Sequence, residues 1–176
     1  MSNTQRPAAD EFGQFYTGYI SLVSETDIVG AMRTQLDEIL ALLRKVPEKV
    51  GDVRHAPYTW SIKEVVGHMS DCERIMTYRA LRFARGDAMP LPGFEENDYV
   101  RVAGFDRRTL ASIIDELESV RRSSVNLFEN LPDEACPRRG EANKNAVTVR
   151  ALAYVVVGHA RHHLNILRKR LTTAAP

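Results

Sequence analysis

Apolar residues recur every three or four positions in four long stretches of this chain, and this period predicts four amphipathic helices. The first stretch runs from Asp27 to Val46 and stops before Pro47, which disfavours a continuing helix. The second runs from Ser61 to about Arg85. Ser61 and Glu64 form a capping-box pattern at its start, because each side chain can accept a hydrogen bond from an otherwise unpaired backbone N–H.

The third stretch runs from Arg107 to Leu131, and the fourth begins near Thr148. In the fourth, two positions of the apolar stripe are occupied by His159 and His163. No stretch shows the sustained alternation of apolar and polar residues that marks a half-buried strand. The sequence therefore predicts an all-α protein.

Four helices of about twenty residues each bury their apolar stripes most simply as a four-helix bundle. The connections 87–105 and 132–147 are long, so we expect at least one crossover connection. A segment rich in aromatic rings, 12–19, precedes the first helix, and we expect it to cover one end of the bundle. We expect the polar segment 1–10 to be flexible and residues 11–176 to form a single domain.

The composition is that of an ordinary globular protein, with 44% apolar residues, 27% charged residues and a net charge of +1. This charge gives no reason to expect nucleic acid or a membrane surface as a partner. The N-terminus lacks the apolar core of a signal peptide, and no stretch approaches the ~20 apolar residues that cross a bilayer. Cys72 and Cys136 suggest no disulfide framework, so we expect a cytoplasmic protein.

Three histidines lie on apolar stripes: His68 on the second helix, and His159 and His163 on the fourth. Residues four positions apart point to the same side of a helix, so the last two imidazoles face the same way. Three neutral imidazoles with an open fourth position are typical of a catalytic metal site. This ligand set suits zinc, nickel, iron or manganese.

His162 is a competing neighbour, because it could pair with His159 at a spacing of three. It falls in line with Val155 and Lys169, which places it on the flank of the stripe. A single helix histidine is usually a hydrogen-bonded core or surface residue. Two on one stripe and a third on another helix favour metal binding, and a metal-free bundle with three neutral imidazoles remains the alternative.

Other polar residues lie near His68 on the second helix and are candidates for supporting the site or contacting substrate, as is His162. Cys72 follows one turn later, where it could join the ligands or remain an inert buried thiol. Asp71 could accept a histidine N–H or face solvent. Arg79 shares the apolar stripe, so its guanidinium needs an anionic ligand or a carboxylate partner. The candidate partners are Glu73, Glu96 and Asp98.

Three segments resemble the DinB/YfiT-like superfamily: residues 58–74, which read YTWSIKEVVGHMSDCER, residues 78–87 with YRALR and RGD, and the late GHARHH at 158–163. The resemblance spans Tyr19 to Leu171. It implies a four-helix bundle with a crossover connection, often dimeric. It also implies a divalent metal ion held by one histidine of the second helix and two of the fourth, and by position these are His68, His159 and His163.

Characterised relatives include transferases and isomerases that use low-molecular-weight thiols. The sequence thus leads to a metal-dependent enzyme, with transfer of a low-molecular-weight thiol to a small electrophile as the most concrete form. We expect a homodimer with no nucleic-acid or membrane partner. The alternative is a non-catalytic metal-binding or stress-response module, in which the metal only rigidifies the bundle.

Overall fold

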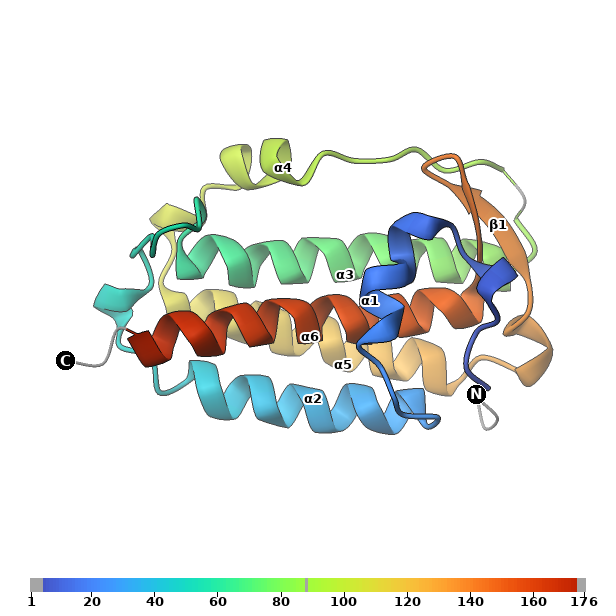
Figure 1. Cartoon of the computed structure of the whole chain (residues 1–176), viewed down its shortest axis with the longest axis horizontal. Helices are drawn as coiled ribbons and strands as arrows, with labels where there is room; N and C mark the ends of the chain where they lie inside the picture. The colour runs from blue at the N-terminus through green and yellow to red at the C-terminus, as the bar shows by residue number, and fades with distance from the viewer. Residues whose placement is uncertain (1–4, 88, 174–176) are drawn as a thin grey trace.

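The computed structural model describes residues 5–87 and 89–173, and its main body is a bundle of four long helices (Figure 1). All four predicted helices are present. They are α2 (Ile28–Leu43), α3 (Ile62–Ala84), α5 (Leu110–Glu129) and α6 (Val149–Thr173). Short 3-10 turns lie at Ala9–Glu11, Gln14–Tyr16, Glu48–Val50, Phe105–Arg107 and Asp133–Ala135.

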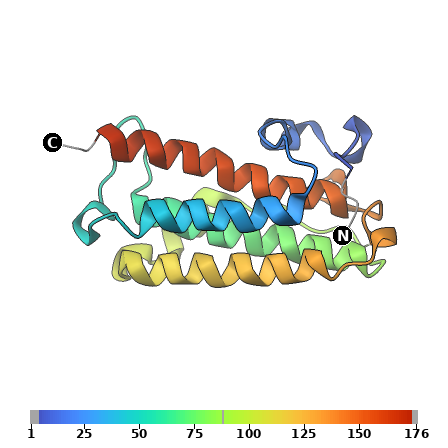
Figure 2. The same ribbon diagram turned by 90° about the horizontal axis from the view of Figure 1, so that it is seen from below.

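The order of the helices around the bundle differs from their order in the chain. α3 packs against α5 and α6, and α2 packs against the same two helices, so α2 and α3 face each other across a diagonal. α3 and α5 run in the same direction, because the connection between them returns along the length of the bundle (Figures 1 and 2). The predicted crossover connection is therefore confirmed.

Two of the helix starts show how side chains fix the boundaries. At the start of α3, Ser61 accepts a 3.2 Å hydrogen bond from the backbone N–H of Glu64, whose carboxylate accepts a 2.6 Å bond from the N–H of Ser61. This is the predicted capping box. The third helix begins at Leu110, not at Arg107 as predicted, because Thr109 caps it and Arg107 belongs to a 3-10 turn.

A β-hairpin occupies the end of the connection 132–147, where the all-α prediction left no strand. Strands β1 (Arg139–Ala142) and β2 (Asn145–Thr148) pair in antiparallel fashion. Asn143 and Lys144 form the turn with φ of 51° and 60°, the left-handed conformation that a type I′ hairpin turn requires at both central positions. Strands of four residues are too short to show an alternating pattern, so the prediction missed them.

Two short helices lie outside the predicted set, α1 (Thr17–Ser21) and α4 (Glu96–Ala103). α1 lies across α6 near its middle, so the expectation that the aromatic segment covers a bundle end was wrong (Figure 1). The close approach requires Gly158, because a Cβ atom there would lie 2.1 Å from the carbonyl oxygen of Tyr19.

The N-terminal segment 1–10 is described only from residue 5, so residues 1–4 of the segment predicted to be flexible lie outside the described part. Arg6 donates a 3.0 Å hydrogen bond from Nη2 to the carbonyl oxygen of Ile20. Asp10 accepts a 2.9 Å hydrogen bond from Arg139. These contacts attach residues 6–10 to α1 and to the hairpin.

The apolar core consists of two clusters, one toward each end of the bundle. Along α2, Met32 belongs to one cluster and Ile39 to the other, and the buried Gln35 lies between them. Glu73 of α3 and Arg121 of α5 are buried at the same level. A layer of polar side chains therefore separates the two apolar clusters.

Hydrogen bonds join this polar layer across all four helices. Arg121 donates from Nε and Nη2 to one carboxylate oxygen of Glu73, at 3.1 and 2.8 Å. Its Nη1 donates to Gln35 at 2.8 Å, and Gln35 donates at 3.0 Å to the carbonyl oxygen of Val157. The Arg121 charge lies close enough to contribute to the lowered pKa of His159. The polar layer therefore lies beside the stretch of α6 that carries the histidines.

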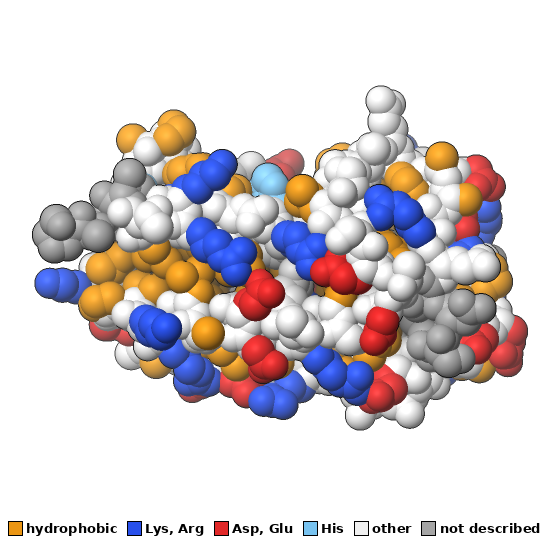
Figure 3. Space-filling view, turned by 60° about the horizontal axis from the view of Figure 1, so that its bottom comes forward, with side chains coloured by type: hydrophobic (Ala, Val, Ile, Leu, Met, Phe, Trp, Pro, Cys, Tyr) orange, Lys and Arg blue, Asp and Glu red, His pale blue; other side chains and the backbone are white. Residues whose placement is uncertain are grey.

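The surface carries both signs of charge. On the face shown in Figure 3, basic and acidic side chains are interspersed, in keeping with the net charge of +1. None of the helices built from the described residues combines the length and apolar character needed to cross a membrane.

Candidate metal centre

His68, His159 and His163 converge between α3 and α6. The Nε2 atom of His159 lies 3.0 Å from Nε2 of His68 and 3.1 Å from Nε2 of His163. One ligand atom from each of the three residues can be chosen so that all lie within 4.8 Å of one another. All three side chains are buried. The structure thus brings together the three histidines that the sequence singled out.

The nitrogen positions fit a metal ion. Four-coordinate zinc, with bonds of 2.0–2.1 Å, holds its ligand nitrogens about 3.3 Å apart, close to the two separations measured from Nε2 of His159. Burial lowers the pKa of His68 to about 4 and lowers those of His159 and His163 well below the usual value, and neighbouring histidines add to each shift. The imidazoles are therefore neutral at pH 7, which is the form that binds metal.

A glycine immediately precedes the first histidine of each helix, Gly67 before His68 and Gly158 before His159. A Cβ atom on Gly67 would lie 2.3 Å from the ring of Phe105, and Gly158 admits the backbone of α1 in the same way. Each glycine lets a covering segment approach the helix beside a histidine. The two Gly-His pairs are therefore a signal in the sequence for close packing beside the histidines.

The metal-free protein should lose stability as the pH falls below 6.5. Unfolded histidines take up protons near pH 6.5, whereas folded His68 does so only near its pKa of about 4. Each histidine of this kind lowers the free energy of unfolding by about 1.4 kcal/mol per pH unit in that interval. Urea unfolding of chelated protein at about pH 7 and 5.5 measures the slope. If the free energy of unfolding of His68→Leu fell with pH as steeply as that of the wild type, this explanation would be contradicted.

Aromatic rings flank the cluster on two sides. The ring of Trp60 lies 4.8 Å from that of His68, and the ring of Tyr19 lies 5.3 Å from that of His159. On the Tyr19 side, a cavity of about 60 Å³ reaches His68 and His159. On the Trp60 side, a pocket of about 250 Å³ reaches His163. The cluster is therefore approached from two directions.

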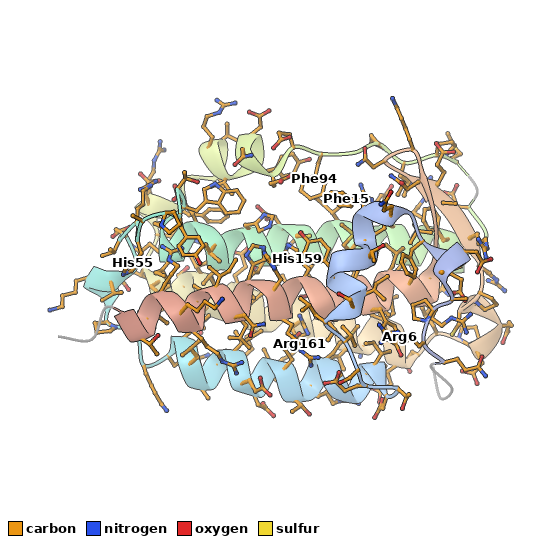
Figure 4. All side chains as sticks on the ribbon, in the orientation of Figure 1. Arg6, Phe15, His55, Phe94, His159 and Arg161 are labelled. Atoms are coloured by element: carbon orange, nitrogen blue, oxygen red, sulfur yellow. The ribbon has the colours of Figure 1, made fainter. Side chains whose placement is uncertain are left out.

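The Tyr19 cavity (about 60 Å³) is built by segments far apart in the sequence. Figure 4 shows Phe15 and Phe94, from two different covering segments, close together above α3, with His159 below. The N-terminal segment, the crossover connection and the hairpin all contribute to this cavity, and the first and last of these were not expected there because neither has a helical apolar period. The residues contributed by these segments are Phe15, Tyr16, Tyr19, Phe94, Glu96 and Asn143.

The structure places the other candidate residues differently. Cys72 lines the Tyr19 cavity, and burial raises its pKa to about 12, so its thiol is protonated. Asp71 binds Arg74 at 3.5 Å, not a histidine. His162 is exposed and contacts the ring of Tyr19 at 5.7 Å. Arg79 is buried in the wall of the Tyr19 cavity.

A four-helix bundle with one crossover and a buried cluster of three histidines defines the class of this protein. A family model of the DinB superfamily matches residues 31–167, so the chain belongs to the DinB superfamily. No protein with a curated description matches it significantly in sequence.

Solved structures share the fold. YfiT from Bacillus subtilis superposes on this chain with a TM-score of 0.66 at 14% sequence identity, and the match covers 96% of this chain and 94% of that chain. YfiT is described as a probable metal-dependent hydrolase with an unusual four-helix bundle topology. A protein from Streptococcus pneumoniae superposes with a TM-score of 0.72 at 11% sequence identity, and the match covers 93% of this chain and 100% of that chain. An uncharacterized protein from Clostridium difficile 630 superposes with a TM-score of 0.66 at 12% sequence identity, and the match covers 85% of this chain and 96% of that chain. At these identities the likeness shows the fold alone.

Proposed function

We propose that this chain is a metal-dependent enzyme whose divalent ion, zinc, nickel, iron or manganese, is held by His68, His159 and His163. The observation that carries the proposal is the convergence of three neutral imidazoles at 3.0 and 3.1 Å beside a cavity. When bound, the ion would act as a Lewis acid that lowers the pKa of a thiol or water in its open position.

On the Tyr19 side of the cluster, the nucleophile comes from outside the chain. Cys72 is the only thiol among the residues that line the Tyr19 cavity, and in the metal-free protein burial raises its pKa to about 12. The same lining contains no serine, threonine or lysine. An activated nucleophile is therefore a bound small molecule.

We propose a low-molecular-weight thiol as that molecule, because aromatic rings and Met76 give the cavity an apolar lining that suits sulfur. In the reaction, the sulfur forms a bond to an electrophilic carbon. The leaving group departs with the electron pair of the broken bond, and the thiol proton passes to solvent. Hydrolysis by water is the second candidate, and the description of YfiT favours it.

The test compares zinc-loaded protein, chelated protein and His68→Ala at equal concentration. Thiol consumption with chlorodinitrobenzene reports S-transfer, and nitrophenyl acetate reports hydrolysis. We expect thiol consumption by the loaded protein alone. Ester cleavage without thiol transfer supports hydrolysis instead. Equal rates in all three samples for both substrates would contradict catalysis and favour a non-catalytic metal-binding module.

Metal removal should lower stability without unfolding the bundle. A ligand that binds only the folded state stabilises it by RT ln(1 + [L]/Kd), about 2.7 kcal/mol at a hundredfold excess over Kd. The two apolar clusters do not depend on the ion, so the helices remain. Thermal melts with and without chelator, followed by circular dichroism, measure the shift. Loss of helical signal at room temperature on chelation would contradict this prediction.

A further inference from the structure

Arg79 carries a positive charge into the wall of the Tyr19 cavity. Its side chain is only 3% exposed. The guanidinium donates from Nη2 to the carbonyl oxygen of Pro92 at 2.8 Å and from Nη1 to the hydroxyl of Tyr16 at 3.4 Å. The ring of Phe94 lies 5.9 Å from its central carbon. These oxygen and ring contacts are with neutral groups, so they leave the charge uncompensated.

The expected carboxylate partners of Arg79 are engaged elsewhere or are exposed. Glu73 binds Arg121 at 2.8 Å, and Asp98 binds Arg101 at 2.8 Å. Glu96 lines the same cavity from an exposed position in α4. Across the described ranges no carboxylate lies within 4.0 Å of the Arg79 guanidinium. A buried charge without a partner is costly, which is the arrangement expected where an anionic ligand supplies the partner.

The free donors of Arg79 have the geometry for a carboxylate. No hydrogen bond joins its Nε–H to any residue in the described part of the chain, and Nη2 uses one of its two protons on Pro92. Nε and Nη2 form one edge of the guanidinium, which matches the two oxygens of a carboxylate.

Arg79 lines one cavity together with His68 and His159. Arg79 follows His68 by three turns of α3, about 16 Å along the axis, with Cys72 and Met76 on the wall between them. Helical side chains incline toward the N-terminus, so the guanidinium reaches back toward the histidines. A ligand that contacts both must be elongated.

We propose that the cavity binds a small elongated molecule that carries a metal-binding atom at one end and a carboxylate at the other, and that Arg79 binds the carboxylate. This inference rests on the proposed function, because the other end of the molecule is held at the metal site. It names the substrate class of that site.

Mercaptohexanoate and mercaptohexanol, which differ in the carboxylate, are the probes. We titrate each into cobalt-loaded protein and follow the thiolate absorption band. Wild type should bind the acid at least about tenfold more tightly than the alcohol, since hydrogen bonds between a guanidinium and a carboxylate are charge-assisted. Arg79→Met should bind both equally, at the affinity of the alcohol. Mercaptoacetate is too short to reach both the metal site and Arg79, so it should bind wild type and Arg79→Met with equal affinity.

Three further variants keep the test decisive. Arg74→Met, which removes an exposed arginine of α3, should keep the preference for the acid. Glu96→Gln should keep or increase it, because a carboxylate of the cavity wall is removed. Arg79→Lys, which retains the charge, should show an intermediate preference and serves if Arg79→Met does not fold.

Equal affinities of the two thiols for wild type, or an undiminished preference in Arg79→Met, would overturn the inference. Binding of mercaptohexanol shows that the metal site itself works, so that result leaves the proposed function standing. Failure of the protein to take up cobalt overturns both.

Discussion

His68→Ala, His159→Ala and His163→Ala should each lose most of the bound divalent metal, whereas His162→Ala should retain it. The three buried imidazoles converge, and His162 lies on the exposed flank of α6. Loss of a residue that only supports a ligand costs about 10–100-fold in affinity, so loss of a ligand should cost more. Elemental analysis of tag-free protein, as metal per chain, measures the effect.

His162→Ala is the matched control, because it removes a histidine one residue from His163. Each variant is checked for helical content by circular dichroism before metal is measured. Metal retained in His163→Ala but lost in His162→Ala would show that the wrong neighbour was assigned to the site.

Arg121→Met should destabilise the protein by about 3–5 kcal/mol, the largest stability effect that we expect. The substitution leaves the Glu73 carboxylate buried without its partner, and one oxygen of that carboxylate already lacks a hydrogen bond from any described residue. Urea unfolding of the metal-free protein measures the change.

The double variant Arg121→Met/Glu73→Leu should recover most of the lost stability, because it removes the unpaired charge together with its partner. Arg122→Met, at the exposed neighbouring position, should change stability by less than about 1 kcal/mol. A double variant as unstable as Arg121→Met would contradict the charge-burial explanation.

The helices could be predicted because their causes are local. The period of the apolar residues predicted the four long helices, and the capping box at Ser61 predicted where the second of them begins. The phase of the stripes also separated His163 from His162 without knowledge of the fold. These inferences need only the geometry of one helix at a time.

The partners of buried charges could not be predicted, because they depend on which helices are neighbours. Glu73 and Arg79 lie on the same helix six residues apart, and the sequence left them as candidate partners. In the structure Glu73 meets Arg121, because α3 packs against α5. The hairpin and α1 escaped prediction for a related reason, since packing and not period determines short elements.

X-ray absorption spectroscopy at the zinc edge of tag-free, zinc-loaded protein identifies and counts the atoms bound to the ion. We expect three imidazole nitrogens around the ion, from His68, His159 and His163, with no sulfur. Scattering from sulfur, which would place Cys72 among the ligands, or fewer than three imidazoles would contradict this expectation.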